Sequence, residues 1–238
     1  HLLRSLKAAH PDLLIDVTFE LWGGWHQIDY GLIACADLCW LSNIADAENA
    51  GGYGPAQVRH LAAERSHLLP PEHCVIGNLR CNGPHPTESV LSAFAAYPML
   101  LGDLSALTEQ QSTEIQTLLA WLKAQADEFD LCQHYGVLTP ITGQRPGQHS
   151  WSGFLRCDRH GNGILALFRN LSPVSTETLP IPLPETLPGK SALTLQSFSK
   201  KSPVTATADA LRQGLAGHIP ATHGWSLYAL RSQSNFTD

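Results

Sequence analysis

The residues best suited to chemistry lie in one short segment rich in glycine, tryptophan and carboxylates. It reads Phe19-Glu20-Leu21-Trp22-Gly23-Gly24-Trp25-His26-Gln27-Ile28-Asp29-Tyr30-Gly31-Leu32. Sugar rings pack on flat aromatic faces while carboxylates bind their hydroxyls, and a carboxyl group is the usual acid catalyst for a glycosidic oxygen. The segment therefore indicates carbohydrate chemistry, with Asp29 as the candidate general acid/base. The candidate substrate contacts are Glu20, Trp22, Trp25 and His26.

Each of these residues also has an ordinary structural interpretation, which for Trp22 and Trp25 is packing against the rest of the protein. Asp29 can cap a helix that begins near Tyr30, where a carboxylate accepts hydrogen bonds from free backbone amides. Glu20 can form a salt bridge at the end of the loop instead of binding a hydroxyl. The chain has 12 histidines, so His26 alone is a weak sign of a substrate contact. For Asp29 and Glu20 the sequence leaves both interpretations open.

A short apolar run precedes this segment and predicts a buried strand. It extends from Leu13 to Phe19, after an expected helix over Leu2 to Ala9. Further apolar runs alternate with expected helices, in the order 38–41 (strand), 55–69 (helix), 74–76 (strand), 87–97 (helix) and 98–101 (strand). Parallel strands need helical crossovers, so this alternation predicts a parallel α/β arrangement. Loops at the carboxyl ends of such strands carry the catalytic residues of α/β barrels.

The sequence pattern changes from alternating helices and strands to short β-rich runs after a long helix. That helix is expected from the N-cap Thr108, with Gln111 at the capping-box position, to about Glu128. From Tyr135 onward, short β-rich runs between turn-forming residues predict an antiparallel β domain. These runs are 151–157, 163–168, 192–198 and 225–230. We therefore expect two domains, residues 1–130 and residues 131–238.

The order of these features resembles the family 36 α-galactosidases and their relatives. In that family a strand is followed by Cys-Ser-Ser-Gly-Gly-Gly-Arg-Phe-Asp, whose Asp is the acid/base, and a Trp-x-Ser-Asp motif lies on the next strand. Matching motif to motif places Asp29 on the acid/base and Trp40-Leu41-Ser42-Asn43 on the second motif. Met99-Leu100-Leu101-Gly102-Asp103-Leu104, followed by a helix, is similar to the family's last barrel strand.

The resemblance implies both a fold and an activity. The implied fold is α/β plus β, with the second half of a (β/α)8 TIM barrel followed by an antiparallel β-sandwich. The implied activity is retaining, α-galactosidase-like hydrolysis of O-glycosidic bonds in a carbohydrate substrate. The resemblance also adds Trp40, Ser42 and Asn43 to the candidate substrate contacts. Trp40 also suits a core position, because it lies inside an apolar strand.

Three departures from the family motifs limit what carries over. Leu21-Trp22 replaces Cys-Ser-Ser, His26-Gln27 occupies the Arg position, and Asn43 stands where the family has Asp. Those positions hold the sugar in the family, so galactose specificity is not implied.

The family's nucleophile is an Asp on an earlier barrel strand, and a whole barrel takes roughly 250 residues. The α/β part ends near Asp130, and the chain starts at His1 without an initiator Met. We therefore expect a piece of a longer product, with its nucleophile outside this chain and no activity of the chain alone. One alternative is a non-catalytic carbohydrate-binding or scaffold protein derived from the same fold. Another is a module whose open sheet edge pairs with a second copy, as a homo-oligomer.

Composition excludes several classes of partner. The net charge is -6 over 238 residues without any Lys/Arg cluster, so neither nucleic acid nor an anionic membrane surface is expected to bind. No apolar run reaches the length of a membrane span. The six cysteines lack paired zinc spacing, so we expect buried, reduced thiols, a cytoplasmic protein, and no metal or other cofactor.

Overall fold

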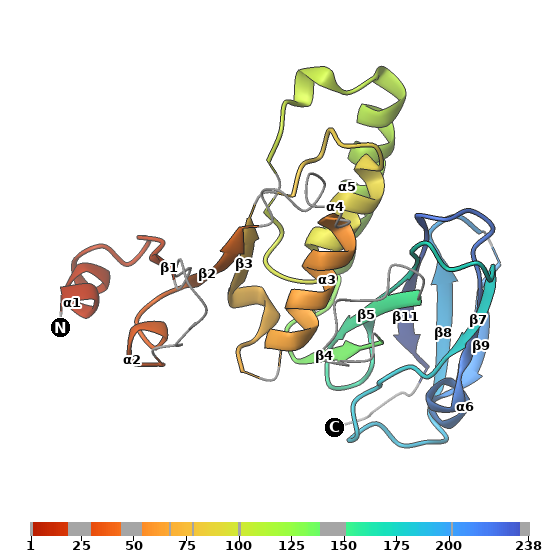
Figure 1. Ribbon diagram of the computed structural model, residues 1–238. Helices are drawn as coiled ribbons and strands as arrows, with labels where there is room; N and C mark the ends of the chain where they lie inside the picture. The colour runs from red at the N-terminus through yellow and green to blue at the C-terminus, as the bar shows by residue number, and fades with distance from the viewer. Residues whose placement is uncertain are drawn as a thin grey trace.

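The structure is a computed structural model with mixed helices and strands (Figure 1). It describes residues 2–18, 30–43, 54–66, 68–77, 79–99, 101–138, 151–200 and 202–233, without the side chains of Tyr30, Ser42 and Asn43. Within these ranges the strands form one parallel sheet, a larger antiparallel sheet and a two-stranded antiparallel ribbon.

The parallel sheet contains β1 (Asp16–Thr18), β2 (Leu38–Asn43) and β3 (Cys74–Gly77), in that spatial order. Parallel bridges from Val75 to Tyr97 and from Arg80 to Leu101 continue the same order beyond β3. The predicted parallel pairing is therefore confirmed for these strands, and each strand lies beside its successor in the chain.

Helix α1 (Leu2–Ala9) precedes the first parallel strand. Helices α2 (Tyr30–Ile33), α3 (Gly54–Arg65) and α4 (Pro86–Ala93) connect the parallel segments that follow, and single 3-10 turns occur at η1 (Pro71–His73) and η2 (Leu104–Ala106). The helix predicted over 87–97 ends earlier because Tyr97 is already extended in its bridge to Val75. The long helix α5 (Glu109–Glu128) has the predicted capping box between Thr108 and Gln111.

Six antiparallel strands form the larger sheet, in the order β4-β5-β6-β11-β8-β9. Their bounds are β4 (His134–Val137), β5 (Trp151–Cys157), β6 (Gly163–Arg169), β8 (Ala192–Ser197), β9 (Val204–Thr207) and β11 (Gly224–Ser232). The four predicted runs match β5, β6, β8 and β11 to within two residues at each end. The remaining elements are the ribbon strands β7 (Thr176–Leu179) and β10 (Leu215–His218), and the short helix α6 (Ala208–Gln213).

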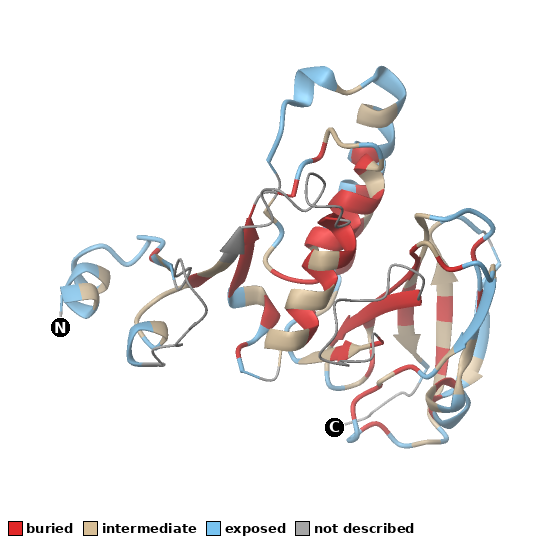
Figure 2. Cartoon of the chain, viewed as in Figure 1, coloured by how far each residue is buried: buried red, intermediate tan, exposed pale blue. Residues whose placement is uncertain are grey.

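Both faces of the large sheet are buried at its centre (Figure 2). Along β6, Ile164 and Phe168 point into a cluster shared with the helices, whereas Leu165 and Leu167 point into a second cluster on the opposite face. Successive strand residues face opposite sides, so a strand covered on both faces has a continuous apolar sequence. That is the pattern of Gly163-Ile-Leu-Ala-Leu-Phe168.

The first of these clusters joins the two halves of the chain. Leu91 of α4 and Leu118 of α5 belong to the same buried cluster as Phe154, Phe168 and Leu227 of the sheet. The helices and the sheet therefore share one core across residue 130. By contrast, α1 at the other end of the chain contains no buried residue.

Candidate functional site

The predicted catalytic segment leaves the carboxyl end of β1, and most of it lies outside the described residues. Five predicted site residues lie outside the described residues: Glu20, Trp22, Trp25, His26 and Asp29. β1 and β2 are parallel, so their last residues, Thr18 and Asn43, lie at the same edge of the sheet. The two segments that follow these strands in the chain thus start from one edge, which is the edge that carries catalytic loops in α/β barrels.

The second predicted motif occupies the end of β2. Trp40 is half-buried and pairs with Thr18 on one side and Val75 on the other. Ser42 and Asn43 pair with β3, and their side chains lie outside the described part of the structure. The ladder changes register between Trp40 and Ser42. Such irregularities are frequent next to active sites, because they change the direction of a side chain.

Asp16 is the one carboxylate residue within β1, β2 and β3. Its side chain is exposed, and it accepts a hydrogen bond from the main chain of Trp40. Although the residue is exposed overall, neighbouring atoms displace part of the water around its carboxyl group and raise the pKa of Asp16, while that hydrogen bond opposes the shift. A retaining glycosidase needs a pair of carboxyl groups. These three strands do not supply a pair.

The cysteines are free, and their arrangement does not suit a metal. Cys39 and Cys74 are opposite each other on β2 and β3, and both are buried. Burial raises the pKa of the Cys74 thiol to about 12, so it stays protonated, whereas metals bind the thiolate. No group of three or more potential metal ligands occurs among the described residues. The expectation of buried thiols fails at Cys132, which is exposed.

A buried polar cluster, which the sequence did not indicate, joins α3 and α4 to the large sheet. We call it the Arg59 cluster, and it consists of Arg59, Glu88, Ser92, Ser152 and Asn170. The Arg59 guanidinium donates to Glu88 Oε1 at 3.2 Å, to Ser152 Oγ at 3.1 Å and to Asn170 Oδ1 at 2.6 Å. It also donates to Ser92 Oγ, and every member is at most 2% exposed.

Phe168 completes the surroundings of this guanidinium. The centre of the Phe168 ring lies 3.8 Å from Arg59 Cζ, which is a cation–π contact. Side chains of the protein therefore accept hydrogen bonds from the edge of the guanidinium, and the Phe168 ring covers one of its faces. The arrangement suits a structural clamp and leaves little of the cation available to a ligand.

Two histidines stack beside the Arg59 cluster. The rings of His85 and His223 lie 4.5 Å apart, and the His223 main-chain amide donates to the carbonyl of Asn170. Burial lowers the pKa of both histidines, and the positive charge of Arg59 lowers that of His223 further. Both rings therefore favour the neutral form.

No simple sequence signal leads to these two groups of residues. The Arg59 cluster takes side chains from α3, α4, β5 and the turn after β6, separated by up to 111 positions. A lone arginine on a helix ordinarily reads as a solvated residue. A contact between such distant positions cannot be read from local spacing.

Comparison of the sequence with known protein families and with curated proteins gave no match. Among the described helices, none is both long enough and apolar enough to cross a membrane.

Proposed function

We propose that this chain is the carboxy-terminal part of a retaining, α-galactosidase-like glycoside hydrolase. In this proposal Asp29 is the general acid/base, and the nucleophile is a carboxylate outside this chain. Residues 1–130 are the second half of a (β/α)8 barrel, and residues 131–238 are an antiparallel β-sandwich. The substrate is a carbohydrate with an O-glycosidic bond.

The spatial order of the parallel strands carries this proposal. In a barrel each strand lies beside its successor, whereas a doubly wound sheet reverses its order at a switch point. β1, β2 and β3, and then the bridges at Tyr97 and Leu101, keep the order of the chain throughout. The glycine- and tryptophan-rich segment follows the carboxyl end of the first of these strands, where barrel enzymes bind substrate.

The proposed roles follow from this placement. Asp29 protonates the leaving oxygen in the first step and then removes a proton from the attacking water, as one group does in retaining enzymes. Trp22 and Trp25 provide faces for sugar rings. The remaining proposed substrate contacts are Glu20, His26, Trp40, Ser42 and Asn43.

The test uses the full-length gene product and a panel of aryl glycosides. Asp29→Asn is expected to lower turnover of glycosides with poor leaving groups, on the order of 100- to 10,000-fold, because these need a proton donor. Glycosides with highly activated leaving groups lose much less in the first step. Asp127→Asn, an exposed carboxylate on α5, is the matched control. Equal turnover of both variants on every glycoside would show that Asp29 is not the acid/base.

A non-catalytic sugar-binding protein is the second candidate function. Leu21-Trp22 and Asn43, which replace sugar-binding residues of the family, favour it. This candidate predicts that the full-length protein binds sugars but hydrolyses none of the glycosides, activated ones included. Equilibrium binding and turnover, measured on the same preparation, separate the two candidates.

Two further parts of the proposal concern the cellular compartment of the protein and the partner of its parallel sheet. The six free cysteines support a cytoplasmic location, since oxidising compartments favour disulfides. Among the described residues no strand lies on the side of β1 away from β2, and this side is proposed to pair with the first half of the barrel, or alternatively with a second copy of the chain. Sedimentation of this chain separates a monomer from a homo-oligomer.

A further inference from the structure

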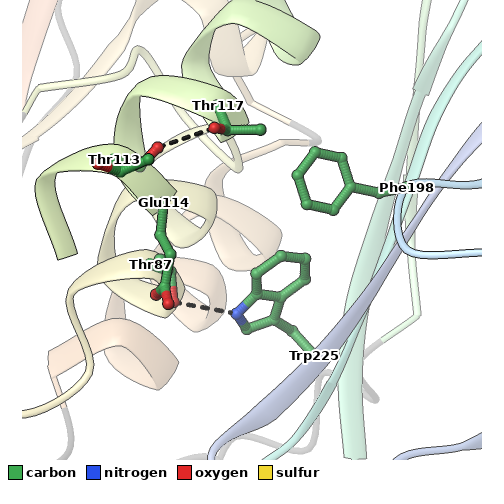
Figure 3. Close-up of a pocket in the computed structure, with 6 residues that line it drawn as sticks. All are labelled: Thr87, Thr113, Glu114, Thr117, Phe198 and Trp225. Carbon is green, nitrogen blue, oxygen red and sulfur yellow. Dashed lines mark hydrogen bonds between the residues drawn. The ribbon is translucent and has the colours of Figure 1, made fainter. Parts of the chain in front are cut away.

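A cavity lies where α4 and α5 meet the large sheet (Figure 3). Its volume is about 300 Å³, at the lower end of the range for small-molecule pockets. We call it the aromatic pocket, and it is lined by Thr87, Thr113, Glu114, Thr117, Phe198 and Trp225.

All three hydroxyl groups of this lining already take part in a hydrogen bond within the protein. Thr113 Oγ1 donates to the Glu109 carbonyl at 2.9 Å, and Thr117 Oγ1 donates to the Thr113 carbonyl at 2.8 Å. Thr87 Oγ1 accepts from Trp225 Nε1 at 3.4 Å. Few directional groups therefore remain for a sugar, whose many hydroxyls need paired donors and acceptors.

Two aromatic rings form one side of the aromatic pocket. The ring centroids of Phe198 and Trp225 lie 5.8 Å apart, with their planes tilted by 45°. Rings at such an angle form a corner, and both side chains are only partly buried. The faces of aromatic rings attract cations, tryptophan most strongly.

Glu114, which is exposed to solvent, adds a negative charge to the lining of the same pocket. Its Oε1 accepts a hydrogen bond from Gln110 at 2.9 Å, and no ion pair of Glu114 occurs among the described residues. Glu114 lies on the helix opposite the two rings in Figure 3. A carboxylate and two aromatic rings around one apolar cavity are complementary to a ligand that is both apolar and positively charged.

We propose that the aromatic pocket binds a small organic cation of the alkylated ammonium class. The charged group lies in the corner between Phe198 and Trp225, and Glu114 neutralises it. Methyl groups on the nitrogen suit the apolar lining better than the strongly hydrated N–H groups of a simple amine. The site is independent of the glycosidase proposal and of Asp29.

The test compares two ligands of the same shape, choline and its neutral isostere 3,3-dimethylbutan-1-ol, by titration calorimetry on the whole chain. Choline is expected to bind at least about tenfold more tightly, the difference that a cation–π contact and a facing carboxylate supply. Equal binding of the two ligands would overturn the proposal in favour of a merely apolar cavity. Absence of saturable choline binding would overturn it as well.

Matched variants assign the binding to this cavity. Glu114→Gln is expected to weaken choline binding several-fold and to leave the isostere unchanged, whereas Glu185→Gln, an exposed residue outside the lining, changes neither. Trp225→Leu is expected to abolish the preference for choline over the isostere. Trp225→Phe keeps an aromatic ring and is expected to retain part of that preference, and it serves as the test if Trp225→Leu does not fold. Unchanged choline binding in both Glu114→Gln and Trp225→Phe would place the ligand elsewhere and contradict the proposal.

Discussion

Arg59 is a charged side chain held almost entirely out of water. It is 2% exposed and its carboxylate partner Glu88 is 1% exposed, and the Arg59 guanidinium donates hydrogen bonds to the side chains of Glu88, Ser92, Ser152 and Asn170. Burying a charge costs several kcal/mol unless other groups replace the lost water. The Arg59 cluster makes that replacement, so its stability depends on all of its members being present together.

Arg59→Met is therefore expected to lower the free energy of unfolding by about 3–5 kcal/mol, because Glu88 stays buried without its cation. Urea denaturation monitored by circular dichroism measures this loss. The double variant Arg59→Met/Glu88→Gln is expected to recover part of it, since no buried charge is left unpaired.

Lys123→Met provides the matched control for Arg59. Lys123 pairs with Asp127 on the surface of α5, where the two side chains are 75% and 63% exposed. Such a pair contributes at most about 1 kcal/mol. If Arg59→Met costs no more than Lys123→Met, then the Arg59 cluster is not the clamp described above.

At the scale of elements, two histidines mark the contact between α4 and the turn that enters β11. His85 is the N-cap residue of α4, and His223 lies directly before β11 with a left-handed φ of 57°. Their stacked rings join a helix terminus to a strand terminus. A proton added to either ring places a new positive charge beside the other ring and near Arg59.

Stability is expected to fall when this contact is acidified. Both folded-state pKa values lie below the usual 6.5, so the unfolded chain binds protons more readily than the folded one in that range. The stabilisation is complete above pH 6.5 and declines as the pH falls below it. Each histidine contributes a slope below the ceiling of about 1.4 kcal/mol per pH unit.

The control is the double variant His85→Asn/His223→Asn. Asparagine is a good N-cap and tolerates the left-handed region, so both backbones keep their conformations. Urea denaturation between pH 7 and pH 5 is expected to show a smaller loss of stability in this variant than in the natural chain. Identical pH profiles would mean that the two rings do not sense pH.

Elements with local signals could be predicted from the sequence. β6 is a continuous apolar run up to Phe168, and α5 begins at the capping box of Thr108 and Gln111. The strand order β4-β5-β6-β11-β8-β9 could not be predicted, because it depends on pairings between distant segments. The predicted residues around Asp29 remain predictions, and so does the division of the chain at residue 130.

The aromatic pocket shows why part of the functional surface escaped prediction. Thr113, Glu114 and Thr117 read as an ordinary exposed helix face, and Trp225 reads as one apolar residue in a strand. Only the packing of α5 against the sheet brings them to one cavity. The spacing of these residues along the chain does not predict that they line one cavity.

At the scale of the whole molecule, the shared core makes the helices and the large sheet depend on each other. Removing α4 and α5 would expose the face of the sheet that carries Phe154, Phe168 and Leu227. Exposing this apolar surface is unfavourable, so the two parts are expected to unfold together.

Unfolding in urea is therefore expected to follow one transition, with coincident midpoints for far-ultraviolet circular dichroism and tryptophan fluorescence. Hydrogen exchange is expected to be fast in α1, which has no buried residue, and slow in β6. Two separated transitions would instead show that residues 1–130 and 131–238 are independent folding units.

The long sequence separation between Arg59 and its partners also affects how the chain folds while it is being synthesised. Its partners Ser152 and Asn170 are 93 and 111 positions away. On a ribosome, which adds roughly 5–20 residues per second, α3 emerges many seconds before those partners exist. During that interval a growing polypeptide carries an arginine and a glutamate on helices whose covering sheet has not yet been made. Contacts between such remote positions form slowly, so the apolar faces of α3 and α4, which carry Val58 and Leu91, are expected to stay uncovered during that interval and to be open to aggregation.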